Sequence, residues 1–189
     1  MCSGADEGTE SAAIMSKSNI VLIGMPGVGK STLGVLLAKH LAYDFIDTDL
    51  LIQNYCEMNL QDYIDKFGAH AFRDLETKIL TELECEHSII STGGSAIYSE
   101  EGMTHLKTIA DVVYLKCSLA DLEKNITNFE DRGLVMKDRP ASTLGELFDE
   151  RLPYYSNWSD LTIELSGQAL DEAYCSVIGA LKDACSRHV

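Results

Sequence analysis

Residues 24 to 31 read Gly24-Met-Pro-Gly-Val-Gly29-Lys30-Ser31, and this stretch decides the fold. It satisfies the phosphate-loop pattern G-x-x-x-x-G-K-[ST]. The apolar run Ile20 to Ile23 precedes it and leucines at helical spacing follow it, so the loop joins a strand to a helix, as the pattern requires. Loops of this kind turn backbone N–H groups and a helix N-terminus toward phosphate groups. The sequence therefore predicts a nucleotide-binding site.

The end of this loop carries the groups that a triphosphate needs. Lys30 supplies a positive charge for phosphate oxygens, and Ser31 supplies a hydroxyl for Mg²⁺. A glycine-rich turn without a ligand would not require the Lys-Ser-Thr ending. We expect the nucleotide to bind Gly27, Val28, Gly29, Lys30, Ser31 and Thr32.

The chain around the loop alternates short apolar runs with amphipathic stretches, which is typical of an α/β fold with a parallel sheet. Apolar residues recur at helical spacing from Leu33 to Leu41 and from Leu170 to Ala184, so both stretches are predicted helices. The predicted strands are short and apolar on both faces, as buried parallel strands are. They are Ile20–Ile23, Asp44–Ile46, Ser88–Ser91, Val112–Leu115 and Leu161–Leu165.

Length and composition favour one globular domain. The chain has 189 residues, of which 46% are hydrophobic and 24% charged, and no apolar run has the length of about 20 residues that a membrane span needs. Its formal charge of −15 argues against nucleic acid and anionic membranes as partners. The six cysteines show no metal-binding or paired spacing, which indicates a reducing, cytoplasmic environment. We expect a monomer.

Two segments differ from the rest of the chain. Residues 1–17 are rich in Ser, Gly, Ala and acids without an apolar core, so we interpret them as a disordered leader, with Met15 as an alternative start. Residues 18–189 would form the single domain. Within it, residues 125–142 lack a clear period and contain Gly133 and Pro140, which indicates a mobile connection.

Two carboxylates follow the second predicted strand in Phe45-Ile-Asp47-Thr-Asp49. Ligands bind at the carboxyl ends of strands in a parallel sheet. One carboxylate near the phosphates would help to hold Mg²⁺, and the other would accept a hydrogen bond or proton from an attacking hydroxyl. The alternative is that one of them only caps the helix that follows.

Arginines and glycines mark further candidate sites. Of only five arginines, four lie in or near the candidate segments, namely Arg73, Arg132, Arg139 and Arg151, and a guanidinium suits a carboxylate or phosphate. For each of them a solvated helix face is the alternative, which we favour for Arg139. Gly93 and Gly94 follow the third predicted strand, where they would let backbone amides approach a ligand, the alternative being an ordinary turn that ends the strand.

In order, these motifs resemble the shikimate kinase family from about Ile20 to Leu165. The resemblance rests on the phosphate loop, Asp47-Thr-Asp49, Phe72-Arg73-x-x-Glu76 and Arg151-Leu-Pro153-Tyr-Tyr155. It implies an ATP-dependent kinase with a five-stranded parallel sheet, a lid at about residues 125–142 and a substrate-binding segment at about residues 50–80. Shikimate, phosphorylated to shikimate 3-phosphate, is the acceptor it implies.

The resemblance also implies roles for single residues. Lys30 and Ser31 would serve phosphate and Mg²⁺, and Asp47 would support the metal. Asp49 would touch the acceptor hydroxyls. Arg73 and Arg151 would bind its carboxylate, with Gly93, Gly94 and Ser95 beside it, and Arg132 would be the lid arginine that reaches the transferred phosphate.

Three departures from the family pattern stand out. The family's Gly-Gly-Gly is Gly93-Gly94-Ser95 here, so a side chain stands where the family has room for the substrate ring, and a positive φ there would be strained. The lid motif Arg-Pro-Leu-Leu is Arg132-Gly-Leu-Val135, and Asn125 replaces the arginine often placed against adenine. These differences leave two alternatives open: a same-fold kinase for another hydroxy acid or polyol, and a non-catalytic nucleotide-binding regulator.

Overall fold

The computed structural model describes residues 16–125 and 143–186. Most of the expected leader lies outside the described residues. So do Arg132, Arg139 and almost all of the expected lid.

The centre of the structure is a five-stranded parallel sheet with the strand order β2-β3-β1-β4-β5. Each pairing is parallel, with Ile20 opposite Ile89 in β1–β3 and Val21 opposite Val112 in β1–β4. The predicted α/β fold is therefore confirmed, and each predicted strand lies within two residues of an observed one. The strands are β1 (Asn19–Ile23), β2 (Asp44–Asp47), β3 (Ser88–Ser91), β4 (Ala110–Lys116) and β5 (Leu161–Glu164).

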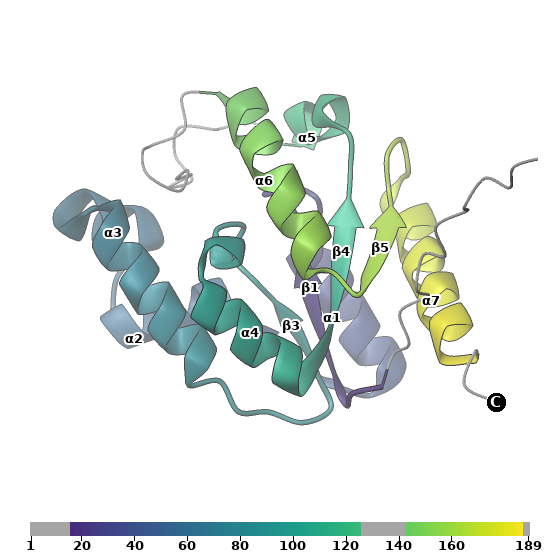
Figure 1. The fold of residues 1–189 in the computed structure, drawn as a ribbon. Helices are drawn as coiled ribbons and strands as arrows, with labels where there is room; N and C mark the ends of the chain where they lie inside the picture. Colours follow the sequence, from purple (N-terminus) through teal and green to yellow (C-terminus); the bar gives the residue numbers. More distant parts are fainter. Residues whose placement is uncertain (1–15, 126–142, 187–189) are drawn as a thin grey trace, which may run out of the picture.

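Helices cover the sheet in two layers. In Figure 1, α4 and α6 lie in front of the sheet and α1 lies behind it, while α2 and α3 extend beyond the edge formed by β2. The α-helices are α1 (Lys30–Leu41), α2 (Thr48–Cys56), α3 (Leu60–Thr81), α4 (Glu100–Ile109), α5 (Leu119–Asn125), α6 (Leu144–Trp158) and α7 (Leu170–Ser186). A short 3₁₀ helix, η1 (Ala96–Tyr98), follows β3. None of the described helices is both long and apolar enough to cross a membrane.

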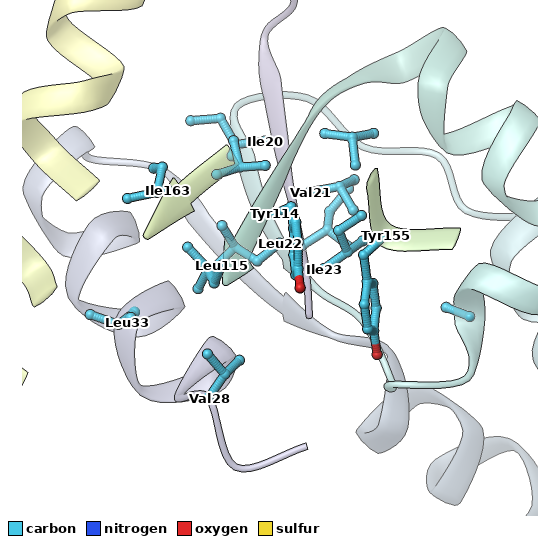
Figure 2. Close-up of a cluster of buried hydrophobic side chains, with 14 of the residues drawn as sticks. Ile20, Val21, Leu22, Ile23, Val28, Leu33, Tyr114, Leu115, Tyr155 and Ile163 are labelled. Atoms are coloured by element: carbon cyan, nitrogen blue, oxygen red, sulfur yellow. The ribbon is translucent and has the colours of Figure 1, made fainter. Parts of the chain in front are cut away.

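The core forms on both faces of β1, all five residues of which are buried. Figure 2 shows apolar side chains of β1 and β4 packed together, with Leu33 of α1 and Tyr155 of α6 among them. The ring of Tyr155 stacks on that of Tyr114, with the ring centroids 5.0 Å apart. Burial of this apolar surface fixes β1, and the loop that follows it, between two helix layers.

The helix pair α2–α3 occupies the segment expected to bind substrate, residues 50–80. A second small cluster, formed by Ile52, Phe72 and Leu75, joins the two helices. Gly68 interrupts α3 with a φ of 86°, a conformation that glycine adopts without strain. The kink changes the direction of the helix before Phe72 and Arg73.

The first described residues pack on the sheet. The backbone N–H groups of Ser16 and Lys17 both donate to Oδ2 of Asp111, at 2.8 and 2.9 Å. The last two residues of the expected leader are thus attached to the start of β4.

Candidate active site

The phosphate loop connects β1 to α1, and its glycines adopt backbone conformations that residues with a side chain rarely adopt. Gly24 has a φ of 147°, and a Cβ there would lie 2.6 Å from the carbonyl oxygen of Leu115. Gly29, at the N-cap of α1, has a φ of 97° and no side chain with which to cap the helix. Because the first turn of α1 also has no acidic residue, its N-terminus is suited to an anion.

Lys30 is buried, with 8% of its surface exposed. Its Nζ donates to the carbonyl oxygens of Gly24 at 2.8 Å and Met25 at 3.1 Å. Burial lowers the pKa of Lys30 from its usual value to about 8, against the opposing effect of Asp49. The loop carbonyls thus hold the ammonium group in place at the pocket.

Asp47 links the phosphate loop to α2. Its Oδ2 accepts a hydrogen bond from the Ser31 hydroxyl at 2.7 Å, and its Oδ1 accepts one from the backbone N–H of Asp49 at 3.0 Å. Asp47 therefore caps the N-terminus of α2, the alternative considered from the sequence, and at the same time binds the hydroxyl of Ser31. Hydroxyl and carboxylate oxygens are the donors that Mg²⁺ prefers, so the two residues fit that ion.

Asp49 projects from the first turn of α2 into the pocket. Burial, followed by the negative charge of Asp47, raises the pKa of Asp49 to about 6, while Lys30 opposes the shift. A carboxylate in this position can accept a hydrogen bond from a hydroxyl group beside the phosphate loop.

Gly93 and Gly94 follow β3 and lie against charged side chains. A Cβ at Gly93 would lie 2.6 Å from Oδ1 of Asp49 and 2.9 Å from Oε1 of Glu76. A Cβ at Gly94 would lie 2.6 Å from a terminal nitrogen of Arg151. A side chain at either position would therefore displace one of these ionic groups.

Ser95 behaves differently from the expectation. It has an ordinary helical backbone, with φ −91° and ψ −11°, so no positive φ strains it. Its side chain is buried, and its hydroxyl donates to Glu76, with Oε1 at 3.0 Å and Oε2 at 2.9 Å. The side chain that departs from the family pattern thus has a partner within the protein.

Glu76, on α3, is a residue to which the sequence analysis assigned no role. It is 1% exposed. Burial, followed by the charge of Asp49, raises its pKa to about 7, and the hydrogen bond from Ser95 is the largest effect in the opposite direction, ahead of the charges of Arg151 and Arg73. The signal in the sequence was Phe72-Arg73-x-x-Glu76, which places Arg73 and Glu76 one helical turn apart.

Arg151, on α6, is a buried cation with 1% exposure. Its Nε donates to the Tyr98 hydroxyl at 3.2 Å, and that hydroxyl donates to Oε1 of Glu150 at 2.6 Å. The Tyr155 hydroxyl donates to the carbonyl oxygen of Gly94 at 3.0 Å. Residues of η1 and α6 therefore fix the guanidinium beside the strand-end glycines.

One pocket of about 660 Å³ joins these elements. From the predicted site it contains Gly27, Gly29, Lys30, Ser31, Thr32, Asp49, Gly93, Gly94, Ser95 and Arg151. The segment expected at about residues 50–80 contributes part of the wall, through residues to which the sequence assigned no individual role, namely Gln53, Asn59, Leu60, Gln61, Ile64 and Phe72.

Among the residues that the structure describes, three of those predicted for the site, Val28, Asp47 and Arg73, do not line the pocket. Val28 turns its side chain into the core (Figure 2), so only its backbone remains available to a nucleotide. Asp47 contacts the site by accepting a hydrogen bond from Ser31, which lines the pocket. Half-buried Arg73 lies near enough to Glu76 to lower the pKa of that carboxyl. Asn125 does line the pocket, and its Nδ2 donates to the carbonyl oxygen of Gly27 at 3.2 Å.

A parallel sheet with a phosphate loop after its first strand, and a pocket between that loop and a helical subdomain, define a P-loop kinase fold. The thymidylate kinase from Candida albicans shares this fold, with a TM-score of 0.60 at 13% identity over 89% of this chain and 92% of that one. The shikimate kinase from Acinetobacter baumannii, solved in complex with shikimate, has a TM-score of 0.81 at 29% identity, over 92% of this chain and 96% of that one.

Sequence comparison identifies the family. The shikimate kinase family model matches residues 26–182. A shikimate kinase from Enterococcus faecalis is 31% identical over 166 residues, which cover 87% of this chain and 99% of that protein. The chain belongs to the shikimate kinase family. The resemblance stated from the four motifs is thereby confirmed, together with the enzyme class, a small-molecule kinase.

Proposed function

We propose that this chain transfers the terminal phosphate of ATP to a hydroxyl group of shikimate. The observation that carries the proposal is the single pocket in which the phosphate loop, Asp49 and Arg151 meet. The loop and Lys30 would bind the phosphates. Arg151 would bind the carboxylate of the acceptor, and Asp49 would bind the hydroxyl that attacks.

The charges in the pocket fit such an acceptor. Arg151 is a buried guanidinium beside Gly94, and a guanidinium binds a carboxylate through two parallel hydrogen bonds. Asp49 lies near enough to Lys30 for each to affect the other's pKa. An acceptor held by its carboxylate at Arg151 would present a hydroxyl to Asp49 beside the phosphate loop.

Mg²⁺ is the metal that the site would take. Ser31 and Asp47 would hold it through their oxygens, with ATP phosphates completing its coordination. Bound there, the ion would neutralise charge on the phosphate oxygens during transfer. Arg132, proposed as the lid arginine, would add a further positive charge. The chain would act as a cytoplasmic monomer.

The test is a coupled assay of ADP release with Mg-ATP and a panel of hydroxy acids that begins with shikimate and quinate. We expect shikimate to be the preferred acceptor, with a product phosphorylated at one hydroxyl. Faster turnover of another hydroxy acid or polyol would replace shikimate as the substrate. Binding of ATP without turnover of any acceptor would favour a regulatory protein.

A further inference from the structure

The buried pair formed by Ser95 and Glu76 stands at the wall of the pocket, which Ser95 lines, and neither side chain has a role in the function proposed above. Ser95 stands at the N-cap of η1, where a serine hydroxyl usually accepts from the helix, yet its side chain makes no such capping bond. The hydroxyl is directed to Glu76 instead, with both carboxylate oxygens within 3.0 Å. The Ser95 side chain thus makes no capping bond to η1 and instead binds a residue 19 positions away in the chain.

Glu76 stands among all the groups proposed to hold the acceptor. Its Oε1 and Oδ1 of Asp49 both lie within 3 Å of the place where a Cβ of Gly93 would stand, so the two carboxylates meet on one side of that glycine. The titratable and charged groups that face Glu76 come from several elements. They are Asp49 of α2, Arg73 of its own helix, and Arg151 and Tyr155 of α6.

A buried carboxylate in such surroundings needs a fixed hydrogen bond. Without one, an ionised group out of contact with water is unstable, and it changes its protonation or its position. The Ser95 hydroxyl is the hydrogen-bond donor to Glu76 in the part of the chain that the structure describes. Glu76 in turn opposes Asp49 and attracts Arg73 and Arg151 by its charge.

We infer that Ser95 is a positioning residue: through its hydrogen bond it fixes the Glu76 carboxylate, and that carboxylate orients Asp49 and Arg151, the two groups that would bind the acceptor. The inference rests on the proposed function for the identity of the acceptor. It gives the serine a role in acceptor binding without any contact between its hydroxyl and the acceptor.

The test is a double-mutant cycle of Ser95→Ala, Glu76→Gln and the double variant, with kcat and KM measured for shikimate and for ATP. Loss of a hydrogen bond to a charged group predicts a rise of about tenfold in KM for shikimate in Ser95→Ala, with KM for ATP unchanged. In the Glu76→Gln background the same substitution should have almost no further effect, because the serine acts through the glutamate. Ser88→Ala, at the buried start of β3, is the matched control and should behave as wild type.

Two results of the cycle would overturn the inference. One is an unchanged KM for shikimate in Ser95→Ala. The other is a pair of effects that multiply in the double variant, which would mean that Ser95 and Glu76 act independently. Either result leaves the proposed function intact, because wild type would still phosphorylate shikimate.

A second measurement needs no acceptor. In protein labelled with ¹³C at the glutamate carboxyls, the NMR signal of Glu76 is assigned as the one that disappears in Glu76→Gln. The chemical shift of that signal is then followed as a function of pH. Ser95→Ala should raise the pKa of Glu76, because the serine bond stabilises the ionised form. An unchanged pKa would overturn the inference. Absence of shikimate turnover by wild type would refute the proposed acceptor alone, since the titration still shows whether Ser95 controls Glu76.

Discussion

Glu76 makes the stability of this protein depend on pH in an unusual direction. Its pKa is raised from the ordinary value of 4.5 to about 7 by burial and by Asp49. Between these two pH values the folded protein binds the proton more tightly than the unfolded chain does. Stability due to this group is therefore full below pH 4.5 and is lost as pH rises toward 7, opposite to the behaviour of a salt-bridged carboxylate.

Glu76→Gln should remove this dependence. The difference between a pKa of 4.5 and one of about 7 corresponds to roughly 3 kcal/mol in the free energy of unfolding. Glutamine keeps the shape and carries no charge. The variant should therefore gain stability relative to wild type by up to about 3 kcal/mol as pH rises from 4.5 to 7.5.

The assay is urea unfolding of both proteins at half-unit steps across that range. Glu84→Gln, at an exposed position between α3 and β3, controls for the loss of any one carboxylate. If the difference between Glu76→Gln and wild type does not vary with pH, Glu76 is ionised in the folded protein throughout, and the reasoning from burial fails.

Three further predictions concern the proposed site and the N-terminal segment. Lys30→Ala should lower turnover more than tenfold while the melting temperature stays near wild type, because within the described residues Lys30 Nζ donates to two loop carbonyls and to no other group; a smaller loss in kcat/KM would contradict its role. Asp49→Asn should lower kcat and leave KM almost unchanged in steady-state assays, since the amide cannot take a proton; a rise in KM alone would make Asp49 a binding residue. A chain that starts at Met15 retains the bonds of Ser16 and Lys17 to Asp111 and should keep its melting temperature and turnover, and a fall of several degrees would show that residues 1–14 pack on the domain.

The strands and the phosphate loop could be predicted because each depends on residues close together in the chain. Buried parallel strands must be apolar on both faces, so Ile20–Ile23 and Val112–Leu115 are recognisable as short runs. The loop carries its own pattern of glycines. Helices α4, α5 and α6 were not located. The helices α4 and α5 have only 10 and 7 residues, and α6 contains Pro153 and buries Arg151, so each has few apolar positions from which a helical period can be recognised.

The acceptor side of the pocket was predicted only in part. Asp49, Gly94 and Arg151 belong to motifs, and the structure brings them to one pocket. The role of Glu76 depends on how α3 packs against the turn after β3, a contact between residues 19 positions apart that no local pattern reveals. The same contact directs the Ser95 hydroxyl to Glu76, whereas the sequence led us to expect it at the acceptor. Its partner could be known only from the fold.

The charge of the chain and the charge of its pocket act over different distances. At −15 the protein repels anions as a whole, yet at physiological ionic strength that repulsion is screened beyond about 8 Å. Lys30 and Arg151 are buried in the pocket, where charges interact more strongly than in water. The nearby carboxylates of Asp49 and Glu76 offset these cations in the absence of ligand. An anionic substrate that reaches the pocket therefore binds Lys30 and Arg151 in competition with these carboxylates.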